Sequence, residues 1–166
     1  MIHDFEKIRK ALADHNPLKN SFVRKRASVL IPMLESEGEF FLMLTRRSNK
    51  MRSHPGQVSF PGGKQDSNDR DSQQTALRET NEEIGLPGEK VDVVGMLDQI
   101  LSLHYYLVTP YVGLIPSDFV PFPNTDEIES VFKVPLTFFM KNENHWSEEK
   151  QTYSSPVLVH HFAYQE

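Results

Sequence analysis

The chain has 166 residues, of which 38% are hydrophobic and 25% charged, with a formal net charge of −5 at pH 7. This length fits one domain with a core of its own, so we expect a single domain over residues 1–166. The absence of cysteine excludes disulfides and thiolate metal sites, and the acidic balance argues against a nucleic-acid partner held by a broad basic surface.

The N-terminal stretch MIHDFEKIRKALADH is interrupted by charged residues and lacks the apolar run of a secretory signal or a membrane span. We therefore expect a soluble intracellular protein without a membrane partner, and the peroxisome, the mitochondrion and the cytosol all stay open. From Phe5 to Ala13 the apolar residues recur at near-helical spacing, which predicts a helix that stops near Pro17.

Several apolar runs predict strands. ASVLIPML and EFFLMLTRR are separated by ESEGE, the pattern of two strands joined by a turn. After the break at Pro87 and Gly88, VDVVGMLDQIL and YLVTPYVGLIP predict further strands, while VPLTFFM and VLVHHFAY are weaker candidates for a strand or a helix start. This order of elements predicts an α+β fold, an α/β/α sandwich.

The segment DSQQTALRETNEEIG predicts the best-defined helix of the chain. It contains good helix formers, a candidate N-cap at Asp71 or Ser72, and Gly85 in the position of a C-terminal stop. Leu77 and Ile84 can face a core. A helix is therefore expected between the acidic turn and Gly85.

Three glutamates of this helix, Glu79, Glu82 and Glu83, point to one side at about 100° per residue. A solvated face is the ordinary interpretation of a charge run, but such a face usually interleaves cations, and the next cation after Arg78 is Lys90. Mg²⁺ or Mn²⁺ would turn the repulsion into attraction, and these ions bind carboxylates together with substrate phosphates. The pattern favours a site for phosphate chemistry.

A glycine pair and a cation cluster precede the helix. In FPGGK, Gly62 and Gly63 allow the backbone to come close to a metal or a phosphate without interference from a Cβ atom. The segment RRSNKMR is the dense cation cluster nearest to the helix, and guanidinium groups bind phosphate in bidentate fashion. Residue chemistry alone therefore predicts a metal-dependent hydrolase acting on a phosphoanhydride.

Two motifs in register resemble the Nudix superfamily. The Nudix box, G-x5-E-x7-R-E-U-x-E-E-x-G-U, is matched by Gly63, Arg78, Glu79, Glu82, Glu83, Gly85 and Leu86. The chain departs from the box at Asp69, which replaces a glutamate with one extra residue before Arg78, and at Thr80, which replaces an aliphatic residue. The Asp69 departure and MLTRRSNKMRSHPGQVSFPGG, which is similar to L-L-T-x-R-[SA]-x3-R-x3-G-x3-F-P-G-G, both resemble the coenzyme A diphosphatase branch.

This resemblance implies a Nudix-type α/β/α sandwich with a mixed central sheet. It implies hydrolysis of the diphosphate bond of coenzyme A or acyl-coenzyme A, which gives 3′,5′-ADP and a 4′-phosphopantetheine product. The Mg²⁺ or Mn²⁺ cofactor would be held by Glu79, Glu82, Glu83 and the carbonyl of Gly63. The substrate would be bound by Arg47, Ser48, Lys50, Arg52, Gly56, Gly62 and Gly63.

The resemblance also implies roles for two further residues. Arg78 would orient Glu79 or pair with Asp69, and the general base would be a box glutamate or Glu127. Asp126 and Glu129, beside Glu127, have a weaker claim to that role. The number of metal ions and the preferred acyl group stay open.

Two alternative functions stay open. One is a Nudix hydrolase of another nucleotide diphosphate, such as ADP-ribose, NADH or a dinucleoside polyphosphate, and the other is a catalytically silent nucleotide-binding module. In either case we expect a small-molecule ligand and a monomer or homodimer. Members of the family usually continue beyond a strand like HHFAY into another strand and a helix, so whether this chain is a shortened form of a longer protein stays open.

Overall fold

The structure is a computed structural model that describes residues 5–19, 25–51, 53–102, 104–141, 143, 145–151 and 156–164. The elements in chain order are α1 (Phe5–Asp14), β1 (Arg26–Ser36), β2 (Glu39–Arg47), β3 (Val58–Ser59), β4 (Gly62–Lys64), α2 (Ser72–Ile84), the 3₁₀ helix η1 (Gly88–Lys90), β5 (Asp92–Met96), β6 (Ile100–Leu101), β7 (Leu107–Leu114), β8 (Ile128–Pro135), α3 (Leu136–Phe139), β9 (His145–Gln151) and β10 (Pro156–Phe162).

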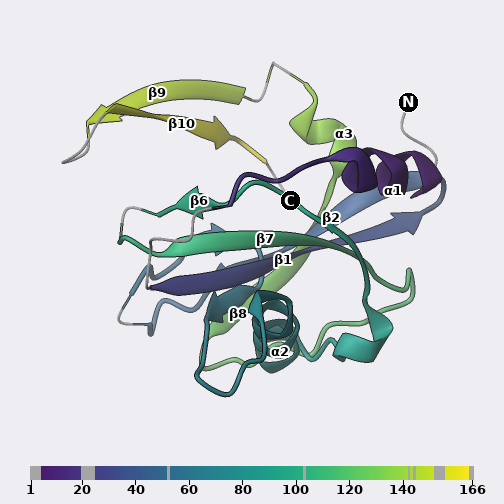
Figure 1. Cartoon of the computed structure of the whole chain (residues 1–166), viewed down its shortest axis with the longest axis horizontal. Coiled ribbons are helices and arrows are strands. Elements are labelled where there is room, and N and C mark those ends of the chain that lie inside the picture. The colour runs from purple at the N-terminus through teal and green to yellow at the C-terminus, as the bar shows by residue number, and fades with distance from the viewer. Residues whose placement is uncertain are drawn as a thin grey trace.

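An eight-stranded mixed sheet forms the centre of the molecule (Figure 1). Its main path runs β3-β2-β1-β7-β5, while β4 pairs with β1, β6 with β7 and β8 with β2. The β1–β7 pair is parallel and the other pairs are antiparallel. Strands β1 and β2 form a hairpin whose two turn residues, Glu37 and Gly38, have φ of 54° and 77°, as a type I′ turn requires.

Helix α2 covers one face of the sheet and α1 the other, so both faces of β1 and β2 are buried (Figure 1). The core on the α2 side is made by Leu30, Leu34, Met43, Ala76, Ile84, Leu86 and Ile115. On the opposite face, Phe5, Ile8 and Leu12 of α1 pack against a second cluster that includes Ile31, Phe40 and Leu42. The alternation along β1 therefore sends even-numbered side chains to α2 and odd-numbered ones to α1.

Strands β9 and β10 form a separate two-stranded sheet above the α1 face of the main sheet (Figure 1). Aromatic contacts attach it to the rest of the molecule: Phe162 of β10 lies with its ring centroid 5.2 Å from Phe139 and 6.4 Å from Phe138. Most other described residues of the hairpin are exposed, and His145 in β9 and Val159 and His161 in β10 are half-buried.

The α+β class and the sandwich with a mixed central sheet are confirmed. The predicted helices at 5–13 and 71–85 and the strand pair before the glycine loop are also present. The single strand expected over VDVVGMLDQIL is wrong, because Leu97–Gln99 interrupts it between β5 and β6. VPLTFFM contains the end of β8 and α3, and VLVHHFAY supplies most of β10.

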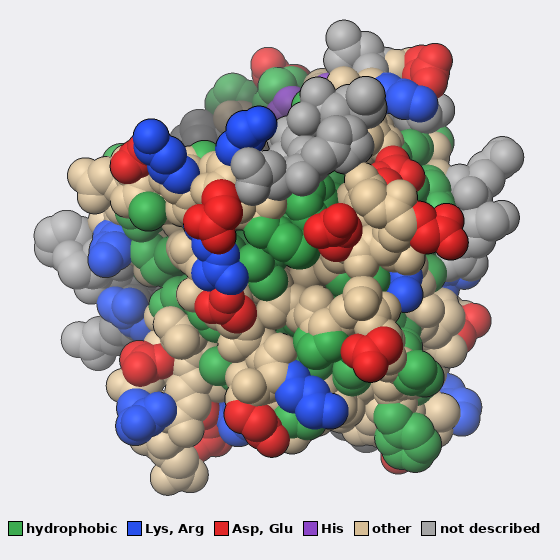
Figure 2. Space-filling model, turned by 90° about the vertical axis from the view of Figure 1, so that its right-hand side faces the viewer, with side chains coloured by type: hydrophobic (Ala, Val, Ile, Leu, Met, Phe, Trp, Pro, Cys, Tyr) green, Lys and Arg blue, Asp and Glu red, His purple; other side chains and the backbone are tan. Residues whose placement is uncertain are grey.

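None of the described helices is long and apolar enough to cross a membrane. On the face in Figure 2, acidic and basic side chains are interspersed among apolar ones, and its described residues form no continuous basic surface. The single domain over residues 1–166 stays a prediction.

Candidate active site

Helix α2 is fixed at both ends, which sets the direction of its acidic side chains. At its start, the side chain of Asp71 accepts a hydrogen bond from the amide of Gln74 at 2.7 Å. At its end, Gly85 adopts the left-handed conformation with φ 71°. The amides of Phe122 and Asn124 then donate to the carbonyls of Ile84 and Glu83 at 2.9 Å each, which ties the loop before β8 to the end of the helix.

Glu83 faces the sheet and is 4% exposed. Its Oε2 accepts a hydrogen bond from the Gly62 amide at 3.1 Å, and its Oε1 lies 3.6 Å from Nη1 of Arg47. Burial raises the pKa of Glu83 to about 7, although the Gly62 amide and Arg47 oppose the rise. The charges of Glu79 and Glu127 add to the rise, which places Glu127 within electrostatic range of both.

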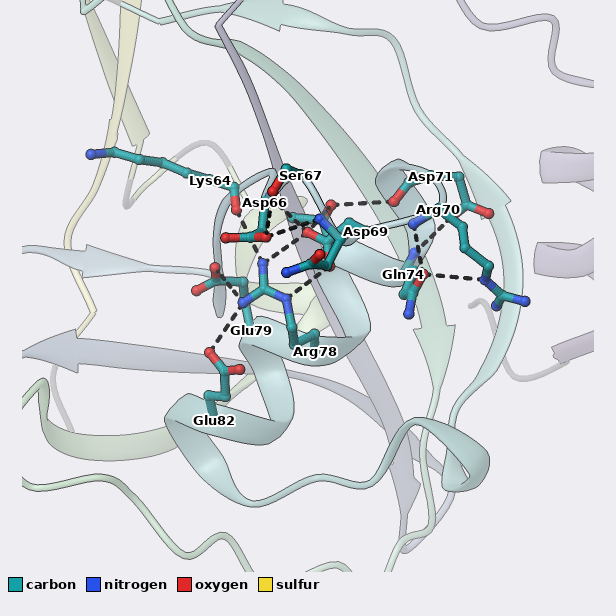
Figure 3. A network of polar contacts seen from close by, with 12 residues as sticks. Lys64, Asp66, Ser67, Asp69, Arg70, Asp71, Gln74, Arg78, Glu79 and Glu82 are labelled. Carbon is teal, nitrogen blue, oxygen red and sulfur yellow. Dashed lines mark hydrogen bonds and ion pairs between the residues drawn. The ribbon is translucent and has the colours of Figure 1, made fainter.

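Arg78 forms hydrogen bonds with three other acidic residues of the site, Asp69, Glu79 and Glu82 (Figure 3). Its Nε and Nη2 each donate to the carboxylate of Asp69 at 2.9 Å, and Nη1 donates to Glu79 at 2.9 Å and to Glu82 at 3.1 Å. The guanidinium holds the pKa of Asp69 far below its usual range. Burial still raises the pKa of Glu79, against the effect of Arg78.

The two glycines before the helix, Gly62 and Gly63, have no Cβ atoms, which lets the backbone lie close to the acidic face of α2. A Cβ atom on Gly63 would collide with the carboxylate of Glu79, and one on Gly62, which has φ 151°, would collide with the carbonyl of Ser28. Any side chain at either position would displace the backbone or the carboxylates. Gly62 and Gly63 thus form a cradle beside the acidic face of α2.

The donor set fits a hard divalent cation. Glu79, Glu82 and Glu83 supply carboxylate oxygens from one rigid helix, which suits Mg²⁺ or Mn²⁺ with water and phosphate completing the shell. Two buried polar atoms of the described chain, Oγ of Ser28 and Nε of Arg47, have no protein partner, and both belong to residues next to this cradle. Such atoms are normally satisfied by ordered water or a ligand.

The carboxylates do not converge on one point, however. No group of three or more His, Cys, Asp or Glu side chains among the described residues could hold a metal as it stands. The sequence argument that this side of the helix lacks interleaved cations needs correction, because Arg78 pairs with Glu79 and Glu82 while Arg47 lies near Glu83. The side chain of Glu82 is 56% exposed and that of Glu83 5%, so the three differ in environment.

The expected substrate loop lies beside the acidic loop. The Ser48 amide donates to the Glu127 carbonyl at 2.7 Å, and Nδ2 of Asn49 donates to Glu129 at 3.0 Å. Gly56 has φ 69° and donates its amide to the carbonyl of Arg47 at 3.1 Å, which closes the loop.

The described part of the chain thus brings together Arg47, Ser48, Gly62, Gly63 and Glu127 with the box glutamates. Lys50 is exposed on the same loop, and the prediction for Arg52 lies outside the described residues. The predicted pairing of Arg78 with Asp69 and its contact with Glu79 are both present. The catalytic, metal-binding and substrate-binding roles themselves stay predictions.

Sequence reasoning did not single out Ser28 or Thr75. Thr75 is fully buried, and its hydroxyl donates to Asp69 at 2.9 Å. Ser28 is fully buried and is paired with Gly63 in the β1–β4 register. A small polar residue in an apolar strand is the one sequence signal that could have drawn attention to Ser28.

Comparison with known proteins shows the family of the chain. The NUDIX domain family matches residues 24–154, so the chain belongs to the Nudix hydrolase family. It is 44% identical over 146 residues to a protein of Arabidopsis thaliana named Nudix hydrolase 15, mitochondrial, covering 86% of this chain and 51% of that protein. It is 40% identical over 139 residues to the mouse peroxisomal coenzyme A diphosphatase NUDT7, covering 84% of this chain and 59% of that one.

The fold is also similar to solved structures. A structure of a C. elegans Ap4A hydrolase binary complex superposes with a TM-score of 0.57 at 19% identity, covering 68% of this chain and 81% of that one. This likeness supports the fold alone. The chain spans about half to three-fifths of the length of the curated relatives named above.

Proposed function

We propose that the protein is a metal-dependent hydrolase that cleaves the diphosphate bond of coenzyme A and its acyl derivatives. The products are 3′,5′-ADP and 4′-phosphopantetheine or its acyl form. The observation that carries the proposal is the Glu83 carboxylate held between the Gly62 amide and Arg47. This contact joins the acidic helix to the arginine-bearing segment that resembles the coenzyme A diphosphatase branch.

The relatives add support for the substrate. The mouse relative is named a coenzyme A diphosphatase, and the motif with Arg47 and Ser48 precedes the glycine cradle in this chain. The relatives' names place them in different compartments, mitochondrial and peroxisomal, so no compartment is carried over.

In the proposed mechanism, Glu79, Glu82 and Glu83 hold the Mg²⁺ or Mn²⁺ ions, with the Gly63 carbonyl as a further oxygen ligand. When bound, the metal neutralises the diphosphate and lowers the pKa of a bound water. Arg78 orients Glu79 and Glu82 by donating a hydrogen bond to each, and Asp69 orients Arg78 by accepting from its guanidinium.

Proton removal from the attacking water is assigned to a box glutamate or to Glu127, whose charge acts on both Glu79 and Glu83. Arg47 and Lys50 bind the phosphate oxygens of the substrate. Water attacks one phosphorus, the bridging oxygen leaves with the other phosphate, and the base takes the proton.

A substrate panel tests the proposal. Coenzyme A, acetyl-coenzyme A, dephospho-coenzyme A, ADP-ribose and a dinucleoside polyphosphate would be incubated with Mg²⁺ or Mn²⁺, and the products separated by liquid chromatography. We expect coenzyme A and its thioester to be cleaved to 3′,5′-ADP, and the Glu83→Gln variant to lose at least a hundredfold in kcat. Preferential cleavage of ADP-ribose or the dinucleoside polyphosphate would overturn the substrate assignment, and full activity of Glu83→Gln would overturn the site.

A further inference from the structure

A cavity of about 460 Å³ opens on the sheet face opposite α2. Its apolar walls come from β1, β7, β6 and the segment before the glycine cradle: Val29, Ile31, Phe60, Ile100, Val108 and Pro110. His15 and Asp98 contribute its polar lining, with Nε2 of His15 3.0 Å from Oδ1 of Asp98. This volume lies in the range of pockets that hold small organic ligands.

A single strand pair, β1 with β4, separates the cavity from the candidate active site. Along β1, Ser28 faces the α2 side and Val29 faces the cavity; their partners in β4 are Gly63 and Gly62. The Gly62 amide holds Glu83, and Cγ1 of Val29 lies 3.0 Å from where a Cβ on Gly62 would stand. The two sites therefore lie on opposite faces at the same end of the sheet.

The lining selects the chemistry of the occupant. Apolar walls favour a hydrocarbon chain and offer a nucleobase few hydrogen-bond partners. Asp98 repels phosphate, so the charged end of a nucleotide does not fit. Ile100 is 61% exposed and extends the apolar surface from the cavity toward the solvent.

We propose that this cavity binds the acyl chain of an acyl-coenzyme A while the diphosphate lies at the glutamates. This inference rests on the proposed function and extends it, because it makes the enzyme selective for acyl-coenzyme A over the free thiol. The flexible pantetheine arm passes around the Gly62–Lys64 end of the sheet. Chain selectivity is then set by residues that do not touch the carboxylates.

The first experiment measures kcat/KM for coenzyme A and for its acetyl, hexanoyl and octanoyl thioesters. Each buried methylene is worth up to about fourfold, so octanoyl should exceed acetyl by at least tenfold. Val108→Phe, which fills the cavity, should bring the octanoyl-to-acetyl ratio close to one, and Val108→Ile should lower it less. The matched control is Val58→Phe, because Val58 lines a second cavity, of about 260 Å³, on the same face, and it should keep the wild-type ratio.

The second experiment needs no turnover. Isothermal titration calorimetry of the metal-free protein with S-octanoyl-pantetheine, which has no phosphate, should show binding with a negative heat-capacity change. Val108→Phe should weaken this binding at least tenfold.

A flat chain-length profile together with no binding of S-octanoyl-pantetheine would overturn the inference while leaving coenzyme A hydrolysis intact. If Val58→Phe lowers the octanoyl-to-acetyl ratio of kcat/KM and Val108→Phe does not, the acyl chain binds in the second cavity. That result would also overturn the inference. If no thioester is cleaved, the proposed function fails, and the calorimetry still decides whether the cavity takes an acyl chain.

Discussion

At the scale of single residues, Glu83 shows how burial and charge oppose each other. The carboxylate has lost most of its hydration, and the Gly62 amide and Arg47 compensate for this only in part. Its pKa in the folded protein, about 7, lies above the ordinary value of 4.5, so folding favours the protonated carboxyl. The resulting stabilisation is fully present below pH 4.5 and is lost as the pH rises to 7.

This sign predicts the behaviour of Glu83→Gln. In the absence of metal, the variant should be more stable than the wild type at pH 8, by roughly 3 kcal/mol at most, and about equal at pH 4.5. Thermal unfolding by circular dichroism in EDTA from pH 4.5 to 8 measures this. Glu82→Gln is the control, because the Glu82 side chain is 56% exposed and the change there should be small. A variant less stable than the wild type at pH 8 would contradict the assignment.

The Asp69–Arg78 pair should behave in the opposite way. The Asp69 side chain is 2% exposed and its pKa is held low, so its stabilisation is present above its ordinary pKa and lost as the pH falls. Asp69→Asn should cost about 3 kcal/mol at pH 7 in urea unfolding, because it leaves the guanidinium without its bidentate partner. The exposed Asp118→Asn should change stability by less than about 0.5 kcal/mol. Equal effects of the two substitutions would show that the pair contributes nothing.

At the scale of elements, the strength of the sequence signal decided what could be predicted. Helix α2 has residues typical of helix caps at both ends, Asp71 and Gly85, and β1 and β2 contain continuous apolar runs. Strand β9, HWSEEKQ, is exposed along most of its length and has no alternation of apolar residues, so periodicity could not predict it. Strand β8 follows an acidic turn and mixes Glu129 and Lys133 with apolar residues, so only its last two residues, Val134 and Pro135, lie in a segment with a strand pattern.

The same difference holds for the site. Helical spacing grouped the three box glutamates, and the FPGGK segment supplied the glycines. The structure places Gly63 against Glu79 and Gly62 against Glu83. Which cation meets which carboxylate depends on residues far apart in sequence, such as Arg47 and Glu83, and on side-chain rotamers. Spacing within one helix contains no information on those contacts.

The end of α2 offers a test of its cap. Gly85 has φ 71°, and a Cβ there would lie 3.2 Å from Cβ of Phe122, so Gly85→Ala should cost about 1 to 2 kcal/mol. Gly88→Ala is the matched control, because a Cβ at Gly88 would make an ordinary contact of 3.5 Å with Leu77. Urea unfolding should show little change for that control. If both variants unfold at the same urea concentration, the left-handed cap does not govern the stability of α2.

At the scale of the whole molecule, the β9–β10 hairpin depends on few aromatic contacts. Phe162→Ala should raise the hydrogen-exchange rates of the β9 and β10 amides at least tenfold, because it removes the rings' contacts with Phe138, Phe139 and His145. The amides of β1 and β7 should keep their protection. Trp146→Ala is the control, since Trp146 stacks on His161 on the other face of the hairpin. Increased exchange throughout the main sheet would mean that the hairpin unfolds together with it.

The parallel pairing of β1 with β7 has a consequence for how the chain folds. The β1–β2 hairpin is local, whereas pairing Arg26 with Leu107 closes a long loop that contains β4 and α2. Contacts between distant segments are costly to form early, and Arg47 of β2 meets Glu83 of α2 in this way, so we expect that contact to be absent from the folding transition state. In stopped-flow measurements, Mn²⁺ should therefore slow unfolding while leaving the refolding rate unchanged. The site would then give the protein kinetic stability, because it forms after the folding transition state and must be broken before the chain can unfold.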